Sequence, residues 1–185
     1  MPVIRRMASH GDWIIGMGGG ELKATGRCIF AMQVTRSRSF DQYWSDEEFR
    51  SKRPVRHGSR RTMVGDNVYH RNPETKKWIQ ENCVHSQVSG EQDASNTNHD
   101  TRTDRVLISD EFYYFGSEAP VVPPRLLRQL GYRNQRGYRK FALDDCRALL
   151  EWIKIEGGTK NCVLSNPFQF RQSEKRFSRV RNRLV

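Results

Sequence analysis

The sequence predicts an α+β fold in which helices flank a small, curved and mostly antiparallel sheet. Short apolar runs with strand character recur along the chain, and amphipathic segments with helical spacing lie between and after them. The 185 residues suit one domain, because a chain of this length can bury a substantial core.

Two strands are expected near the N-terminus, over residues 13–15 and 26–36. In the second, one face is consistently apolar, because Cys28, Phe30, Met32 and Val34 alternate with Arg27, Ile29, Ala31 and Gln33. The glycine-rich residues 16–20 between them could cradle a phosphate or simply connect a hairpin. Since the spacing of phosphate-binding loops is not met, we interpret them as a flexible connection.

A helix is expected to begin after Ser39, which forms a capping box with Gln42. Phe40, Tyr43 and Trp44 then fall at i, i+3 and i+4 and form one aromatic stripe. Such a stripe is more often part of a core than a platform for stacking bases.

Shorter strands are expected to follow the turn at residues 65–67 and to cover residues 78–80 and 106–108. An aromatic cluster at residues 112–115 comes directly after the last of these strands. Residues 89–104 are the most loop-like stretch, and we expect a mobile loop or an active-site flap there. His99 lies within it, where a histidine is usually solvated.

Two helices are expected in the C-terminal third. The first covers residues 125–130 and ends at Gly131, and the second is capped by Asp144 or Asp145 and ends at residues 157–158. The apolar face of the second helix would consist of Leu143, Cys146, Leu149, Leu150 and Ile153.

The formal net charge of +11 comes almost wholly from the C-terminal third. Residues 1–123 hold 17 Lys/Arg and 16 Asp/Glu, whereas residues 124–185 hold 15 and 5. This asymmetry indicates either a solvated basic surface or a footprint for nucleic-acid phosphates. The segment 132–140 interleaves aromatic and basic residues, and its candidate nucleic-acid contacts are Arg133, Arg136, Arg139 and Lys140.

The four cysteines are widely separated and lack metal-ligand spacing, so no metal site is expected and the cofactor is left open. The sequence shows neither a signal peptide nor an apolar run long enough to span a bilayer. We expect a cytoplasmic protein with free thiols, partnered by DNA or a nucleotide and not by a membrane. The oligomeric state is left open.

Several blocks of the chain resemble the second nucleotide-modification-associated domain family of bacteria and phages. The matching blocks are IRR…GDWIIGMGG, IFAMQVTRSRSFDQYW, GDNVYHRN, KKWIQE, His85-Ser86 and DRVLISDEFYYFGSEAP, in that order over residues 3–155. The resemblance implies a role in DNA base or nucleotide hypermodification. It implies no catalytic mechanism.

Family members begin further upstream than this chain, with a strand and an Asn-Pro-bearing loop. We therefore expect residues 1–166 to form an N-terminally truncated domain and residues 167–185 to form a basic tail that folds on a partner. The order of the strands, the Gly-Asp turns and the aromatic helix also resembles the small curved barrels of the PUA-like superfamily.

Polar residues that interrupt strand-like patterns are the candidate site residues, because strand ends often converge on one cleft. We expect a single pocket, with Asp66, His85 and Asn67 as the catalytic set. The candidate substrate-binding residues are Tyr69, Ser109, Tyr114 and Trp44. Alternatively, Asp66 and Asn67 only close a turn, His85 is solvated and Tyr114 belongs to the core.

Two function classes follow from this pocket. An enzyme that modifies a nucleotide or DNA base needs Asp66 and His85 within reach of each other. A non-enzymatic reader of modified nucleic acid needs an aromatic cage with a basic rim instead.

Overall fold

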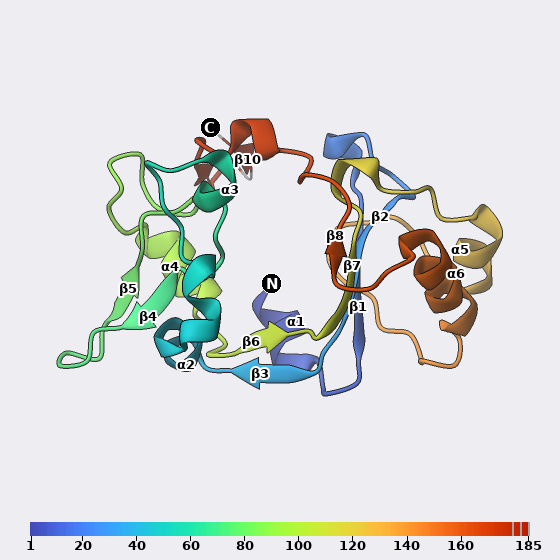
Figure 1. The fold of residues 1–185 in the computed structure, drawn as a ribbon, viewed down its shortest axis with the longest axis horizontal. Helices are drawn as coiled ribbons and strands as arrows, with labels where there is room; N and C mark the ends of the chain where they lie inside the picture. The colour runs from blue at the N-terminus through green and yellow to red at the C-terminus, as the bar shows by residue number, and fades with distance from the viewer. Residues whose placement is uncertain (179, 182, 185) are drawn as a thin grey trace. The chain divides into compact units, whose positions relative to one another are not determined.

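The computed structural model describes residues 1–178, 180–181 and 183–184, and it has the α+β class that the sequence predicts (Figure 1). Its strands form several small sheets in which most neighbouring strands are antiparallel. The chain divides into two compact units. The first contains Met1–Met7, Ser37–Leu107 and Gln169–Val185, and the second contains Ala8–Arg36 and Ile108–Phe168.

The second unit is built on a four-stranded sheet with the order β1-β2-β7-β8. Its strands are β1 (Trp13–Met17), β2 (Cys28–Gln33), β7 (Glu111–Tyr114) and β8 (Cys162–Val163). The antiparallel pairing of β1 with β2 confirms the predicted hairpin. Gly16 lies opposite Phe30, and a Cβ atom at Gly16 would lie only 2.2 Å from the Phe30 ring. The aromatic cluster after residue 110 forms β7, which pairs with β2.

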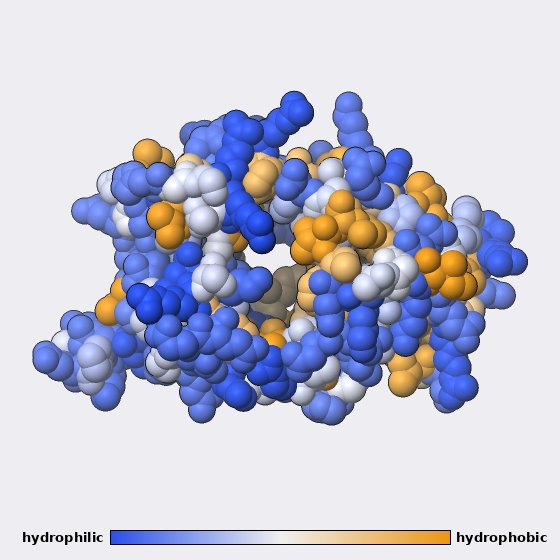
Figure 2. Space-filling view, viewed as in Figure 1, coloured by the Kyte–Doolittle hydropathy of each residue, from blue (hydrophilic) through white to orange (hydrophobic). Residues whose placement is uncertain are grey.

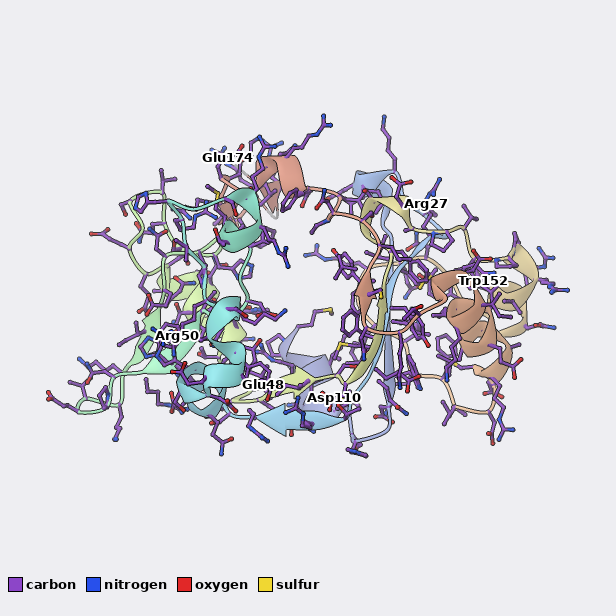
Figure 3. All side chains as sticks on the ribbon, viewed as in Figure 1. Arg27, Glu48, Arg50, Asp110, Trp152 and Glu174 are labelled. Atoms are coloured by element: carbon purple, nitrogen blue, oxygen red, sulfur yellow. The ribbon has the colours of Figure 1, made fainter. Side chains whose placement is uncertain are left out.

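Helices α5 (Pro124–Gln129) and α6 (Arg147–Gly157) complete the core of this unit (Figure 1). Leu149 and Ile153 of α6 are buried together with Tyr113 of β7, and Trp152 packs against this cluster (Figure 3). Burial of these apolar side chains is the main force that holds the helix on the sheet.

The start of α6 differs from the prediction. Neither Asp144 nor Asp145 caps the helix, because it begins at Arg147 after Cys146. Asp144 instead forms an exposed ion pair with Arg147, and Leu143 is 55% exposed. The apolar face therefore begins one turn later than the helical spacing suggested. The helix ends at Gly158, whose positive φ of 59° favours glycine.

The first unit combines short helices with a two-stranded antiparallel sheet of β4 (Tyr69–Arg71) and β5 (Trp78–Gln80). Both strands match the prediction. The helices are α1 (Pro2–Met7), α2 (Phe40–Ser45), α3 (Arg60–Met63) and α4 (Ala94–Asp100), and near the C-terminus β9 (Phe177–Ser178) pairs with β10 (Arg183–Leu184). Helix α2 carries the predicted capping box of Ser39 and Gln42. Its Phe40 and Tyr43 are buried.

Helix α4 corrects the prediction of an unstructured stretch over residues 89–104. Asp93 caps the helix by accepting a hydrogen bond from the backbone N–H of Asn96. The helix buries Asn96 and Thr97, which are 2% and 1% exposed. Because these buried side chains are polar, the sequence has no apolar periodicity that would reveal the helix.

The remaining elements are short. Strands β3 (Arg36–Arg38) and β6 (Val106–Ile108) pair with each other, so the strand expected over 106–108 is present. The strand expected over residues 26–36 is split between β2 and β3. Within the described residues, 3-10 helices cover Gly20–Leu22, Glu47–Lys52, Gly116–Glu118 and Phe170–Gln172.

Candidate active site around Asp100 and His85

The carboxylate of Asp100, at the end of α4, gathers three polar side chains of the first unit. Its Oδ2 atom lies 2.7 Å from His85 Nδ1 and accepts a hydrogen bond of 2.8 Å from the Tyr69 hydroxyl. Its Oδ1 atom lies 3.0 Å from His99 Nδ1. Strand β4 supplies Tyr69, and the turn after β5 supplies His85. Three sequence-distant segments therefore converge on one carboxylate.

This environment keeps Asp100 ionised. Burial opposes its charge, but hydrogen bonds from His85, His99 and Tyr69 outweigh burial and hold the pKa of Asp100 well below its usual range. Burial and the nearby Asp100 charge raise the pKa of Tyr69, which therefore stays a hydroxyl donor. A carboxylate can only accept hydrogen bonds, so Nδ1 of His85 carries the ring proton.

In its neutral form, the His85 ring then has its lone pair on Nε2. Among the residues that the structure describes, Nε2 has no hydrogen-bond partner. The His85 side chain is 37% exposed, whereas the Asp100 side chain is 17% exposed. A histidine oriented by a shielded carboxylate, with an accessible lone pair, has the arrangement of a general base.

The backbone of His85 is hydrogen-bonded as well as its ring. Its carbonyl oxygen accepts hydrogen bonds from the side-chain amides of Gln80 and Asn96, at 3.2 and 2.7 Å. The same Gln80 amide donates to the Tyr69 hydroxyl at 3.0 Å. Gln80 and Asn96 are almost completely buried, so these hydrogen bonds are shielded from water.

Arg5 of α1 supports Asp100 from the backbone side. Its guanidinium donates to the Asp100 carbonyl oxygen and lies 5.0 Å from the centre of the Phe40 ring. Burial lowers the pKa of Arg5, and the charge of Asp100 opposes this effect. A partly buried cation and the ionised carboxylate thus stabilise each other.

Of the predicted site residues, the structure joins His85, from the catalytic set, to Tyr69, from the substrate-binding set, through Asp100. Asp66 is exposed, and its Oδ1 atom accepts a hydrogen bond of 3.0 Å from the Tyr43 hydroxyl. The Asn67 side chain is buried and donates to the carbonyls of Tyr43 and Phe49. Asn67 therefore holds the chain after α2 against the start of β4.

Trp44 has a neighbour on each ring face. The His70 ring stacks on it with centres 4.1 Å apart, and the Arg53 guanidinium lies 4.0 Å from its centre. The Nε2 atom of His70 is in turn hydrogen-bonded to Oε1 of Glu81 at 2.8 Å. A base could stack on Trp44 only after one of these neighbours had moved.

Ser109 and Tyr114 belong to the second unit. The Ser109 hydroxyl donates to the Glu111 carbonyl in a local turn, and Tyr114 pairs with Phe30 in the sheet. Burial raises the pKa of Tyr114. That these two residues share one pocket with His85 remains a prediction.

The second unit also carries the predicted nucleic-acid residues, and Arg133, Arg136, Arg139 and Lys140 are all exposed. A shallow apolar depression of about 240 Å³ is lined by Trp13, Leu143, Arg147, Leu150, Glu151 and Lys154. Figure 2 shows further hydrophobic surface over β8, where Val163 and Leu164 are exposed. Apolar and basic groups are thus both accessible in this unit.

Asp100, His99, Gln80 and Arg5 were not predicted as site residues. The adjacent His99 and Asp100 were visible in the sequence, but the polar composition around them suggested a solvated loop. Gln80 ends a strand and Arg5 lies in an N-terminal helix, and neither position breaks a local pattern. Their roles depend on contacts between distant segments.

Two negative observations apply to the described part of the chain. No group of three or more His, Cys, Asp or Glu residues there could hold a metal ion. No helix there is long and apolar enough to cross a membrane.

A family model described as nucleotide modification associated domain 2 matches residues 1–174. This range contains the whole Asp100–His85 cluster. Neither a curated protein nor a solved structure matches the chain.

Proposed function

Because the chain belongs to the nucleotide modification associated domain 2 family, we propose that it modifies a nucleotide or DNA base with His85 as the general base. The observation that carries this proposal is the hydrogen bond of 2.7 Å between His85 Nδ1 and Asp100. It fixes the ring tautomer and leaves Nε2 accessible. In this proposal the carboxylate paired with His85 is that of Asp100.

The chemistry assigned to each residue follows from its protonation state. His85 Nε2 would accept a proton from a hydroxyl, amine or water that attacks the reacting carbon. Asp100 would stabilise the resulting imidazolium, since the two opposite charges lie in a partly shielded site. Tyr69 and His99 hold the carboxylate in place through its two oxygens. A catalytic role for Asp66, which accepts a hydrogen bond from Tyr43, remains part of the proposal.

The test is a comparison of DNA and nucleotide pools from cells that express the wild-type chain or H85A. Mass spectrometry of the nucleosides should reveal a modified species with the wild type. H85A should reduce its rate of formation by about 10²–10⁴-fold, the usual contribution of general-base catalysis. H57A, which alters an exposed histidine of the same unit, is the matched control. Equal product from H85A and wild type would contradict the proposal.

A reader of modified nucleic acid is the second candidate function. The observation that favours it is the exposure of Arg133, Arg136, Arg139 and Lys140 beside Tyr138 and Phe141, which are each 38% exposed. A PUA-like arrangement, supported by the antiparallel β1-β2-β7 sheet, would suit this function and is proposed with it. Under this candidate, H85A binds DNA like the wild type and neither forms a product. A cytoplasmic location is proposed for both functions.

A further inference from the structure

The turn that carries His85 is held by a segment from the far end of the chain. The Arg176 guanidinium donates to the Cys83 carbonyl at 2.6 Å and to the Asn82 side-chain oxygen at 2.9 Å. Cys83 is 1% exposed, so its carbonyl is shielded from water. The only other side chain that donates to this oxygen, among the described residues, is Ser86 at 2.9 Å.

Phe177, the next residue, continues this contact along the turn. Its backbone N–H donates to the Val84 carbonyl at 2.7 Å, and its own carbonyl accepts from Asn96 at 3.3 Å. The centre of its ring lies 5.7 Å from the centre of the His85 ring. Arg176 and Phe177 thus contact the backbone of both residues that precede His85 and border its ring.

The segment before Arg176 is itself anchored in the first unit. Arg56 donates to the carbonyls of Ser173 and Glu174, at 2.7 and 2.6 Å, and Ser173 is 5% exposed. Glu174 is the second residue after the 3-10 helix at Phe170–Gln172 (Figure 3). Residues 169–177 are therefore held in the first unit by hydrogen bonds.

We propose that residues 169–177 complete the His85 site and that Arg176 is a positioning residue for the His85 ring. Arg176 holds residues 82 and 83 in place, and Phe177 holds residue 84. These contacts orient the His85 ring so that its Nδ1 atom is hydrogen-bonded to Asp100. The inference that Arg176 assists catalysis rests on the proposed function, in which His85 is the general base. The effect of Arg176 on the His85 ring is a property of the free protein.

The experiment is nitrogen NMR of ¹⁵N-histidine-labelled full-length chain, which reports the tautomer of each imidazole ring. In the wild type, Asp100 should hold His85 almost wholly as the Nδ1–H tautomer. Arg176→Ala should lower the ratio of Nδ1–H to Nε2–H at His85 about tenfold, which corresponds to about 1.4 kcal/mol. Arg176→Lys, which keeps one charged donor, should recover part of the ratio.

Two references separate local positioning from general damage. Arg171→Ala removes the same charge from the same segment, but the exposed Arg171 side chain makes no hydrogen bond or ion pair with the described residues. His70 reports on the rest of the first unit, because Glu81 sets its tautomer. The inference is wrong if Arg176→Ala behaves like Arg171→Ala. It is also wrong if His70 changes as much as His85, since Arg176 would then support the fold as a whole.

The two proposals can fail separately. If H85A forms product but Arg176→Ala still frees the His85 ring, the proposed function fails and the positioning role stands. If H85A abolishes product but Arg176→Ala leaves the tautomer ratio of His85 unchanged, the proposed function stands and the positioning role fails.

Discussion

Asp100 is the residue on which the site depends. Its two oxygens accept hydrogen bonds from three side chains, and its backbone carbonyl accepts another from Arg5. A residue with so many partners contributes to folding and to the site at once. Loss of its charge would weaken the hydrogen bonds to two histidines and a buried tyrosine, and one of the two oxygens would no longer be a purely accepting group, which is costly in a partly dry environment.

We expect D100N to lower the free energy of unfolding at pH 7 by about 2–4 kcal/mol. The pKa of Asp100 is lower in the folded state than the ordinary value of 3.8. Its stabilising contribution is therefore complete above pH 3.8 and declines as the pH falls toward the folded-state pKa. The stability gap between wild type and D100N should narrow below this pH.

Urea unfolding at several pH values measures this gap. D145N, which alters an exposed carboxyl of the second unit, should change stability by less than about 0.5 kcal/mol. A gap that stays constant from neutral to acid pH would show that the Asp100 charge does not stabilise the fold.

Helix α4 is the element that brings Asp100 and His99 to the site. It is short and almost free of apolar residues, so its own propensity would not sustain it. Three features hold it in place: the Asp93 cap, burial of Asn96 and Thr97, and the hydrogen bonds of Asn96 to two backbone carbonyls. The surrounding fold thus stabilises the helix by providing two backbone acceptors for the Asn96 side chain.

Removal of the cap should therefore loosen this helix. D93A should lower the free energy of unfolding by about 1 kcal/mol, the typical value for an N-cap, because the Asn96 N–H loses its acceptor. Hydrogen exchange should speed up first at the amides of Asn96 and Thr97. The control is D144A: Asp144 lies before α6 without capping it, so a small effect is expected. Equal effects of D93A and D144A would refute the capping role of Asp93.

At the scale of the whole molecule, the basic C-terminal third is divided between the two units. Residues 124–168 of the second unit hold 9 Lys/Arg and 4 Asp/Glu, and residues 169–185 of the first unit hold 6 and 1. Each of the two segments therefore carries the same net positive charge, since 9 − 4 and 6 − 1 are both 5. In the first unit, Arg176 donates a hydrogen bond to the turn that carries His85. The basic side chains of segment 132–140, in contrast, are exposed. We therefore expect that segment to contribute most to nucleic-acid affinity.

Binding to duplex DNA should weaken steeply as salt increases. Simultaneous replacement of Arg133, Arg136 and Arg139 by alanine should reduce the slope of log K against log salt by about 0.9 for each lost phosphate contact. Fluorescence anisotropy at several salt concentrations measures the slope. The matched control replaces the exposed Lys52, Arg60 and Arg61 of the first unit. A slope that both triple variants leave unchanged would exclude segment 132–140 as a phosphate contact.

Local patterns were sufficient to predict much of the secondary structure. Alternation and β-branched runs located β1, β2, β4, β5 and β6, and the Ser39–Gln42 pair located the start of α2. These signals involve residues that are close in sequence, so they survive in any tertiary context. Two errors, at α4 and at the start of α6, arose where tertiary contacts replaced the local signal.

The sequence by itself determined the α+β class, the family, the basic C-terminal third and His85 and Tyr69 as site candidates. Only the tertiary structure decided that Asp100 is the partner of His85 and that Arg176 holds the His85 turn. Helix and strand periodicity reflect spacings of two to four residues along the chain. The contacts of His85 span 15 residues to Asp100, and those of Cys83 span 93 residues to Arg176. Such contacts form only when burial of apolar side chains brings distant segments, and the polar groups they carry, together. A local sequence pattern therefore cannot predict them.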